Sequence, residues 1–256
     1  MDVTGLPAAV QFLTRVPIRF RREPSLPSAV AWFPVAGALI GVVVGGAAAA
    51  AWHVAPPLLA GALGVLVGVL VTGAFHEDGL ADVADAFAGG WTLERRLEIL
   101  KDPRHGSYGV AALSGSILVR AFALGSVPGP AAMLWSAVAA HAIARGSAVV
   151  LMRSGGIARA EGLGADYARA VSATVATIAG ALSVLIALGA LAGRFRGDAR
   201  AIAATGVLAA LAVLGTAAVG WLARRKIGGV TGDVLGTAEQ VVECLALVAL
   251  ASWRWA

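Results

Sequence analysis

Long apolar blocks separated by short polar segments form the main pattern along this chain. A helix that crosses a membrane needs about 20 mostly apolar residues, and about seven blocks approach that length. They lie near residues 29–53, 56–75, 108–127, 131–152, 171–193, 201–223 and 239–253, the last of which is short. The pattern therefore predicts an all-α, polytopic helical membrane protein with about seven transmembrane helices, within a range of six to eight.

The first block carries Gly37, Gly41 and Gly45 at four-residue intervals. Small residues at this spacing allow two helix backbones to approach closely. We expect this stripe to pack against another helix of the same chain, the alternative being a face for dimerisation.

Residues 5–20 differ from the later blocks. They contain Pro7 and Pro17, and their positive charges follow the apolar part instead of preceding it, which is unlike a cleavable signal peptide. We therefore expect a short N-terminal interfacial helix lying on the membrane surface.

Basic residues predict how the helices are oriented. Clusters of Arg and Lys precede the first block and follow the second, fourth and sixth, whereas the turns at 54–57 and 128–130 have none. Because cytoplasmic loops are enriched in Lys and Arg, the N-terminus is predicted to be cytoplasmic. The loop at 194–200, with three arginines, does not fit this pattern.

Composition agrees with a membrane protein. The chain is 59% hydrophobic and 14% charged, whereas soluble domains are nearer half apolar and about a quarter charged. The net charge of +5 follows from topology and from contact with anionic membrane lipid. The basic residues are scattered over several loops, so no nucleic-acid partner is expected. Cys244 is the only cysteine, which excludes an internal disulfide.

An acidic segment follows the second apolar block directly. It reads His76-Glu77-Asp78-Gly79-Leu80-Ala81-Asp82-Val83-Ala84-Asp85. If the segment is helical, Asp78, Asp82 and Asp85 stand on one face at i, i+4 and i+7. Carboxylates at that spacing repel one another, so we expect a cation beside them, and Mg²⁺ is the simplest candidate. Helix capping would account for one aspartate, but less well for three.

A basic turn precedes the third block. Lys101, Asp102, Arg104 and His105 crowd a stretch punctuated by Pro103 and by glycines. The guanidinium fork of arginine suits phosphate oxygens, so we predict phosphate binding here. The alternative is that these charges only determine topology.

Residues 228–236, between the last two blocks, contain four glycines, Thr231 and Asp233. We expect a flexible loop in which Asp233 completes the carboxylate metal site, the alternative being an ordinary turn with Asp233 as a helix cap.

Several ionisable residues fall inside the apolar blocks: Arg120, His141, Arg145, Glu239 and Glu243. Such residues face the interior of a bundle, where they need partners. For Arg120 a pairing with Glu243 and a functional role are both open, whereas Arg145 is expected to face phosphate.

Carboxylates for a divalent metal, basic groups for phosphate and glycine-rich loops together favour phosphoryl transfer, which needs alignment and charge neutralisation above all. The chain has no Gly-x-x-x-x-Gly-Lys-Ser/Thr sequence, no Gly-x-Ser-x-Gly elbow and no Cys/His zinc pattern.

At these residues the chain resembles the cobalamin synthase family, also called adenosylcobinamide-GDP ribazoletransferases. The resemblance runs nearly end to end, with two departures: Glu77 stands where an apolar residue is common, and Ala86 where glycine is common. Glu77 is therefore not assigned as a metal ligand. The matching segments are residues 12–17, 32–37, 75–85, 101–106, 144–147, 159–164 and 228–236.

The resemblance implies a reaction of cobalamin (vitamin B12) nucleotide-loop assembly. Adenosylcobinamide-GDP and α-ribazole, or α-ribazole 5′-phosphate, would give adenosylcobalamin, or its 5′-phosphate, and GMP. It also implies Mg²⁺ as cofactor and the bacterial inner membrane as location, with the active site on the cytoplasmic side. Residues 1–256 would form a single integral-membrane catalytic domain. A homo-oligomer, or association with other late cobalamin-assembly enzymes, is left open.

The resemblance also suggests roles for particular residues. Metal ligation is predicted for Asp78, Asp82, Asp85 and Asp233, and orientation of the attacking hydroxyl for His76 or Asp82. Lys101, Arg104 and Arg145 would neutralise the transferring phosphoryl group and the leaving GMP. The other predicted substrate-binding residues are Arg15, Asp102, His105, Thr231 and Glu243.

Two other protein classes share some of these features. A CDP-alcohol phosphotransferase pattern begins Asp-Gly-x-x-Ala-Arg, whereas here Asp78-Gly79-Leu80-Ala81 is followed by Asp82. A cation or solute transporter holds its charges near mid-bilayer and has matching repeats, whereas here the carboxylates gather at span ends and the two halves show no repeat.

Overall fold

The computed structural model describes residues 4–20, 26–156, 158, 169 and 171–253, and its regular elements there are helices. Six of them are long and apolar enough to cross a membrane, or up to seven spans result if one bent pair is a single span. The predicted all-α, polytopic membrane architecture is confirmed.

The six long helices are α3 (Phe33–Ala51), α7 (Ser107–Ser126), α8 (Pro130–Ser154), α10 (Ala173–Arg194), α11 (Arg200–Ile227) and α12 (Gly232–Ser252). The bent pair is α4 (Pro57–Thr72) and α5 (Phe75–Gly89), with 90° between them. Three shorter helices are α1 (Gly5–Leu13), α2 (Leu26–Val30) and α6 (Leu93–Ile99).

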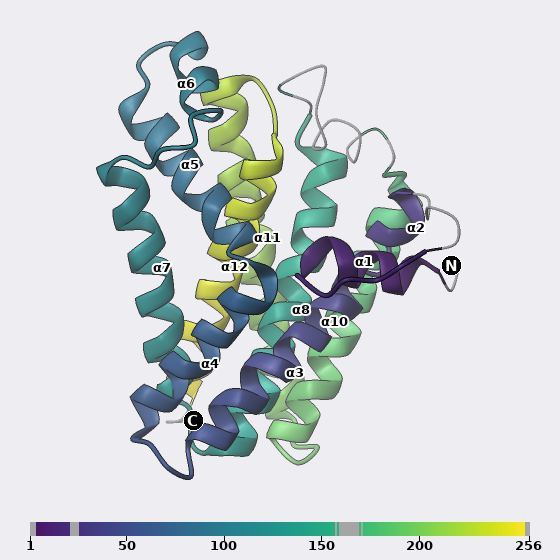
Figure 1. The fold of residues 1–256 in the computed structure, drawn as a ribbon. Coiled ribbons are helices and arrows are strands. Elements are labelled where there is room, and N and C mark those ends of the chain that lie inside the picture. Colours follow the sequence, from purple (N-terminus) through teal and green to yellow (C-terminus); the bar gives the residue numbers. More distant parts are fainter. Residues whose placement is uncertain (1–3, 21–25, 157, 159–168, 170, 254–256) are drawn as a thin grey trace.

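The long helices stand side by side, with α5 and α6 toward one end of the bundle and the end of α12 at the other (Figure 1). Helix α8 forms the centre, because 83% of its most apolar window is buried. The α3 helix packs against it through the glycine stripe: a Cβ on Gly41 would lie 2.6 Å from Cα of Val138. The expected packing within the chain is confirmed.

Helix α1 lies across the long helices instead of running along them (Figure 1). It is shorter than the predicted 5–20, because residues 15–20 are not helical. Ala9 and Leu13 are buried, and the Phe12 ring stacks on Phe33 at 5.6 Å between centroids. The N-terminal helix is thus attached to α3.

Two expected boundaries were wrong for local reasons. The second apolar block ends as a helix at Thr72, because Gly73 and Ala74 take left-handed conformations with φ of 67° and 58°. The last helix begins at Gly232 instead of 239, because Oγ1 of Thr231 caps it by accepting a bond from the Val234 N–H at 3.4 Å. The glycine-rich stretch predicted to be a loop is therefore helical from Gly232 onwards.

Candidate active site

The break between α4 and α5 turns the acidic segment by 90°, so that it packs against α12. Residues 75–89 are helical, as expected, so Asp78, Asp82 and Asp85 share a face. Gly79 lies against the first turn of α12: a Cβ there would be 2.9 Å from the Asp233 carbonyl oxygen. The Thr237 hydroxyl also donates to the Gly79 carbonyl at 3.1 Å. Helix α12 therefore fixes the position of the acidic face.

His105 lies between two of the aspartates. Its Nε2 is 3.3 Å from Oδ1 of Asp78, and its Nδ1 is 3.4 Å from Oδ1 of Asp82. One ligand atom from each of the three residues lies within 4.8 Å of the others. The Asp78 side chain is 64% exposed and that of Asp82 16%. We call these three residues the acidic cluster, and it opens to the surface.

Asp85 has a different set of contacts. Its carboxylate accepts hydrogen bonds from the backbone N–H groups of Gly106 at 2.6 Å and Gly109 at 2.9 Å. These N–H groups begin α7, whose N-cap Gly106 has no side chain to satisfy them. Asp85 therefore attaches the start of α7 to α5, and its role as a metal ligand stays a prediction.

Asp233 lies in the first turn of α12, next to α5. It accepts a hydrogen bond from the Thr231 hydroxyl at 3.1 Å, and it is one of the charged neighbours of Asp82, together with Asp78 and Asp85. Thr231 thus positions Asp233 and caps the helix. Three carboxylates along two turns of α5 and one from α12 thus lie near one another, a concentration of negative charge that favours a bound cation.

The predicted phosphate-binding turn lies beside this cluster. Arg104 binds Asp102 through two hydrogen bonds, Nε to Oδ1 at 2.8 Å and an Nη to Oδ2 at 2.7 Å. This guanidinium holds the pKa of Asp102 at about 2, so that carboxylate is ionised at neutral pH. The Arg104 side chain is 85% exposed, and Lys101 is also exposed. Both cations lie on the surface, within reach of a soluble phosphate.

Arg15 contacts the α4–α5 break. Its backbone N–H donates to the Val71 carbonyl at 2.7 Å, and its guanidinium packs where a Cβ of Gly73 would be. The Phe12 ring meets Phe75 edge-on at 5.4 Å. The N-terminal segment therefore supports the start of α5, and a substrate contact of Arg15 stays a prediction.

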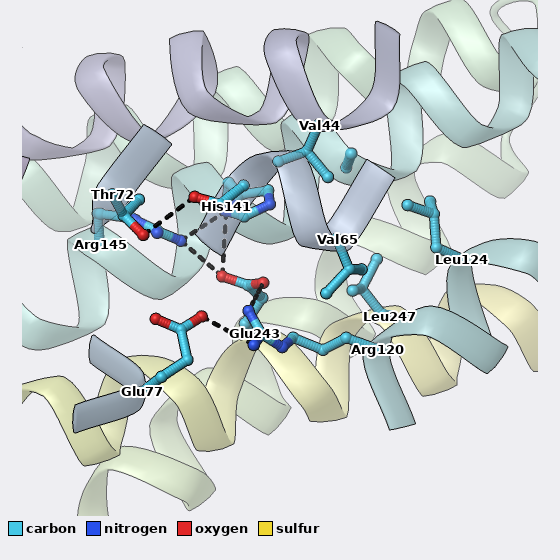
Figure 2. A pocket seen from close by; sticks show the side chains of 12 residues that line it. Val44, Val65, Thr72, Glu77, Arg120, Leu124, His141, Arg145, Glu243 and Leu247 are labelled. Carbon is cyan, nitrogen blue, oxygen red and sulfur yellow. Dashed lines mark hydrogen bonds and ion pairs between the residues drawn. The ribbon is translucent and has the colours of Figure 1, made fainter. Parts of the chain in front are cut away.

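A buried ionic network lies deeper in the bundle (Figure 2). Arg120 of α7 donates to Oε1 of Glu243 at 3.0 Å and to Oε1 of Glu77 at 2.8 Å. All three side chains are 4% exposed or less. The pairing of Arg120 with Glu243 that the sequence left open is confirmed.

Arg145 of α8 completes the network. It donates to Oε2 of Glu243 at 2.6 Å, lies 2.7 Å from Nδ1 of His141, and forms an ion pair with Glu239. His141, Glu239 and Glu243 have the spacing of a metal site. The guanidinium of Arg145 already occupies the place of a cation among them, so we do not assign a metal there.

Three residues assigned to the active site therefore lie inside the network. Arg145 and Glu243, predicted to bind substrate, are 2% and 1% exposed and bind each other. His76, 5% exposed, lies 3.2 Å from Oε2 of Glu239. Their positions favour a structural role, and their substrate contacts stay predictions.

Sequence reasoning did not assign several members of this network. Neither Glu77 nor Ser116, whose hydroxyl donates to Oε1 of Gln240 at 2.9 Å, is among the predicted site residues. The signal was present, because Glu239, Gln240 and Glu243 interrupt an apolar helix at adjacent positions and at a spacing of three to four residues. Such interruptions mark one interior face of the helix.

Comparison with known proteins places this geometry in a family. The family model described as cobalamin-5-phosphate synthase matches residues 5–251. A curated relative from Chlorobaculum tepidum, named adenosylcobinamide-GDP ribazoletransferase, is 36% identical over 98% of this chain and 96% of its own. Relatives with the same name from Ralstonia pickettii (37% identical, covering 96% and 94%) and Mesorhizobium japonicum (40%, covering 93% and 88%) agree. No solved structure matches the fold.

Proposed function

The chain belongs to the cobalamin-5-phosphate synthase family, and on that basis we propose that it is an adenosylcobinamide-GDP ribazoletransferase. Its substrates would be adenosylcobinamide-GDP and either α-ribazole or α-ribazole 5′-phosphate. The products would be adenosylcobalamin, or its 5′-phosphate, and GMP. We place the enzyme in the bacterial inner membrane with the acidic cluster on the cytoplasmic side. Family membership argues against the phospholipid-synthase and transporter alternatives.

The proposed chemistry is a displacement at phosphorus. A ribose hydroxyl oxygen of the acceptor forms a bond to the phosphorus that carries cobinamide, and the bond from that phosphorus to the bridging oxygen breaks. GMP leaves with the bridging oxygen. The hydroxyl proton goes to Asp82. His105, whose Nδ1 lies 3.4 Å from Oδ1 of Asp82, is placed to accept that proton from the carboxylate. Of the two predicted orienting groups, Asp82 is favoured because His76 is buried against Glu239.

The residues present fit Mg²⁺. The ion prefers oxygen ligands and keeps several waters, and Asp78 and Asp82 offer carboxylate oxygens within 4.8 Å of each other. Asp233 is the next carboxylate beside Asp82. The imidazole nitrogen of His105 suits other divalent ions better, so we assign it to proton transfer and phosphate contact. Bound Mg²⁺ would supply neutralisation of the diphosphate charge.

The exposed cations complete the proposed site. Lys101 and Arg104 would approach the diphosphate and the departing GMP, which are the most negative parts of the substrates. Arg104 forms an ion pair with Asp102. A substrate phosphate would therefore bind the Arg104 guanidinium together with that carboxylate or in its place. Bidentate binding of phosphate by arginine makes such an exchange geometrically feasible.

The observation that supports this proposal best is the contact of His105 with both Asp78 and Asp82. It joins the acidic helix to the basic turn, two segments about 25 residues apart that both match the family pattern.

The test is product formation by the detergent-solubilised protein. Adenosylcobinamide-GDP, α-ribazole 5′-phosphate and Mg²⁺ are supplied with and without EDTA, and GMP and cobalamin 5′-phosphate are measured. We expect EDTA to abolish turnover and Asp82→Ala to lower it by at least about 100-fold.

Asp198→Asn is the matched control. Asp198 is an exposed aspartate paired with Arg200 in the loop between α10 and α11, and its variant should keep full activity. Turnover unaffected by EDTA would refute the metal assignment. No product from folded wild-type protein would refute the activity itself.

A further inference from the structure

A groove with about 420 Å³ of internal space lies between α8, α10 and α11, in the bundle but away from the acidic cluster. Its volume is within the range of small-molecule sites, about 300–1,000 Å³. Its walls are apolar or small, apart from a few hydroxyls and one charged residue, Arg224. The reaction proposed above uses none of these side chains.

Arg224 marks the end of the groove that lies at the membrane surface. It stands in the last turn of α11, beside Arg225 and Lys226. Arg225 stacks over the ring of Trp221 with 4.8 Å to the centroid, and Trp221 is 52% exposed. Exposed tryptophan and arginine at a helix end are typical of the headgroup region. Arg224 therefore lies at headgroup depth.

The length of the groove matches one leaflet. Its lining runs along α8 from Ser154 to Ile143 and along α11 from Arg224 to Ala209. At 1.5 Å per residue, these stretches span about 16 Å and 22 Å. One leaflet of hydrocarbon is about 15 Å thick. The groove thus reaches from the headgroups to about the middle of the bilayer.

The groove also opens sideways onto the bilayer. Val213 of α11 is 68% exposed, and Val150 of α8 and Val184 of α10 are 39% and 36% exposed. All three line the groove. Because their helices are long enough to cross the membrane, these exposed faces contact lipid, and an acyl chain can enter from the side.

We propose that this groove binds one acyl chain of an anionic phospholipid, with the lipid phosphate on Arg224. Charge complementarity supports this occupant, since three consecutive cations end α11. Arg224 has a hydrogen bond to the Ser154 carbonyl of 3.5 Å, which is at the weak limit for such bonds, so a phosphate competes easily for the guanidinium.

Thr216 allows an experiment to distinguish a lipid acyl chain from the nucleoside substrate as the occupant of the groove. Its hydroxyl is buried in the middle of the groove without a hydrogen-bond partner in the described part of the chain. An acyl chain offers it none, whereas the base of α-ribazole carries a nitrogen acceptor. Thr216→Val should therefore leave lipid binding unchanged and would weaken binding of a base.

The experiment uses phosphatidylglycerol with a photoactivatable group on its acyl chain, incorporated in phosphatidylcholine nanodiscs with the whole protein. Cross-linked peptides are identified by mass spectrometry. We expect cross-links on residues 143–151 and 209–217. Ala212→Trp, which fills the groove, should remove them, whereas Ala210→Trp, on the exposed face of the same helix, should not. Arg224→Gln should reduce competition by unlabelled phosphatidylglycerol about fivefold, as expected for one basic residue, and Arg225→Gln should not.

Three outcomes would overturn the proposal. Cross-links that persist in Ala212→Trp would show that the lipid lies outside the groove. Competition by phosphatidylcholine equal to that by phosphatidylglycerol would show that Arg224 does not select an anionic lipid. Displacement by α-ribazole that depends on Thr216 would show that the acceptor substrate, not lipid, fills the groove. Retained elution of each variant as a folded protein is the control for unfolding.

Discussion

Glu243 illustrates how a single residue can hold several helices together. It accepts bonds from Arg120 and Arg145, which come from α7 and α8, while only 1% of its side chain is exposed. Three glutamates and two arginines make up the charged core of the network. Removing Glu243 takes from each arginine one of the two carboxylates that it binds, so two buried guanidinium groups lose a partner at once.

We predict that Glu243→Ala lowers the free energy of unfolding by about 3–5 kcal/mol, the usual cost of breaking a buried ion pair. The measurement is unfolding in mixed micelles with increasing denaturing detergent. Arg120→Met in the same background should cost less than it does alone, because the two side chains interact directly. Additive losses would contradict the assigned pairing.

A second prediction distinguishes the two possible roles of Asp85. If it holds the start of α7, Asp85→Ala destabilises the protein by about 1 kcal/mol, as the loss of a cap does, and leaves the Mg²⁺ concentration for half-maximal activity unchanged. Asp82→Asn should raise that concentration at least about tenfold. A similar rise in both variants would make Asp85 a metal ligand.

Helical periodicity predicted part of this site. The rest depends on tertiary contacts, which the sequence pattern does not reveal. The common face of Asp78 and Asp82 follows from a spacing of four residues in a helix. The contact of His105 with both depends on how the turn before α7 folds, and the burial of Arg145 depends on α12, far along the chain. Hydropathy shows that such residues face inward, but not toward which partners.

At the scale of elements, the α4–α5 break decides where the site lies. The apolar pattern predicts one continuous block over 56–75, since leucine and valine continue through it. Gly73 and Ala74 end the helix by adopting left-handed conformations, which hydropathy does not register. Six of the seven apolar blocks coincide with helices long enough to cross a membrane. The block at 56–75 ends early, and the bend after it, which directs the carboxylates, was not predicted.

A pair of substitutions tests this break. Gly73→Ala should destabilise the protein by at least about 1 kcal/mol, because an L-residue strains the left-handed conformation and its Cβ would meet the Arg15 guanidinium. Ala74→Gly should be neutral or stabilising by less than about 1 kcal/mol, since relief of strain offsets chain entropy. Thermal unfolding of both variants is the measurement, and equal losses would refute a structural role for the break.

At the scale of the whole molecule, the structure accounts for the loop that did not fit the charge pattern. Arg194 donates to the Ser136 hydroxyl at 2.7 Å and to the Leu250 carbonyl at 2.9 Å. Arg200 pairs with Asp198. Arg194 therefore binds α8 and α12, and Arg200 is neutralised within its own loop, so these two arginines count less as topology determinants. A cytoplasmic N-terminus stays the prediction.

Accessibility in intact cells checks that orientation. With Cys244 replaced by alanine, a cysteine at Asp198 should react with an impermeant maleimide from outside. A cysteine at Glu94, in α6 at the same end of the bundle as α5 (Figure 1), should react only after permeabilisation. The reverse labelling pattern would invert the topology and place the site outside the cytoplasm.

The network also sets an order on biosynthesis. Arg120 meets Glu77 as soon as α7 follows α5 into the membrane, so this charge is neutralised early. Arg145 must wait for Glu239 and Glu243, which belong to α12, and Glu243 is synthesised 98 residues after Arg145. Until then α8, the centre of the bundle, carries an arginine without its counterions. A chain that lacks α12 would therefore carry the Arg145 charge inside the bundle without either of these carboxylates, at a high cost in the membrane.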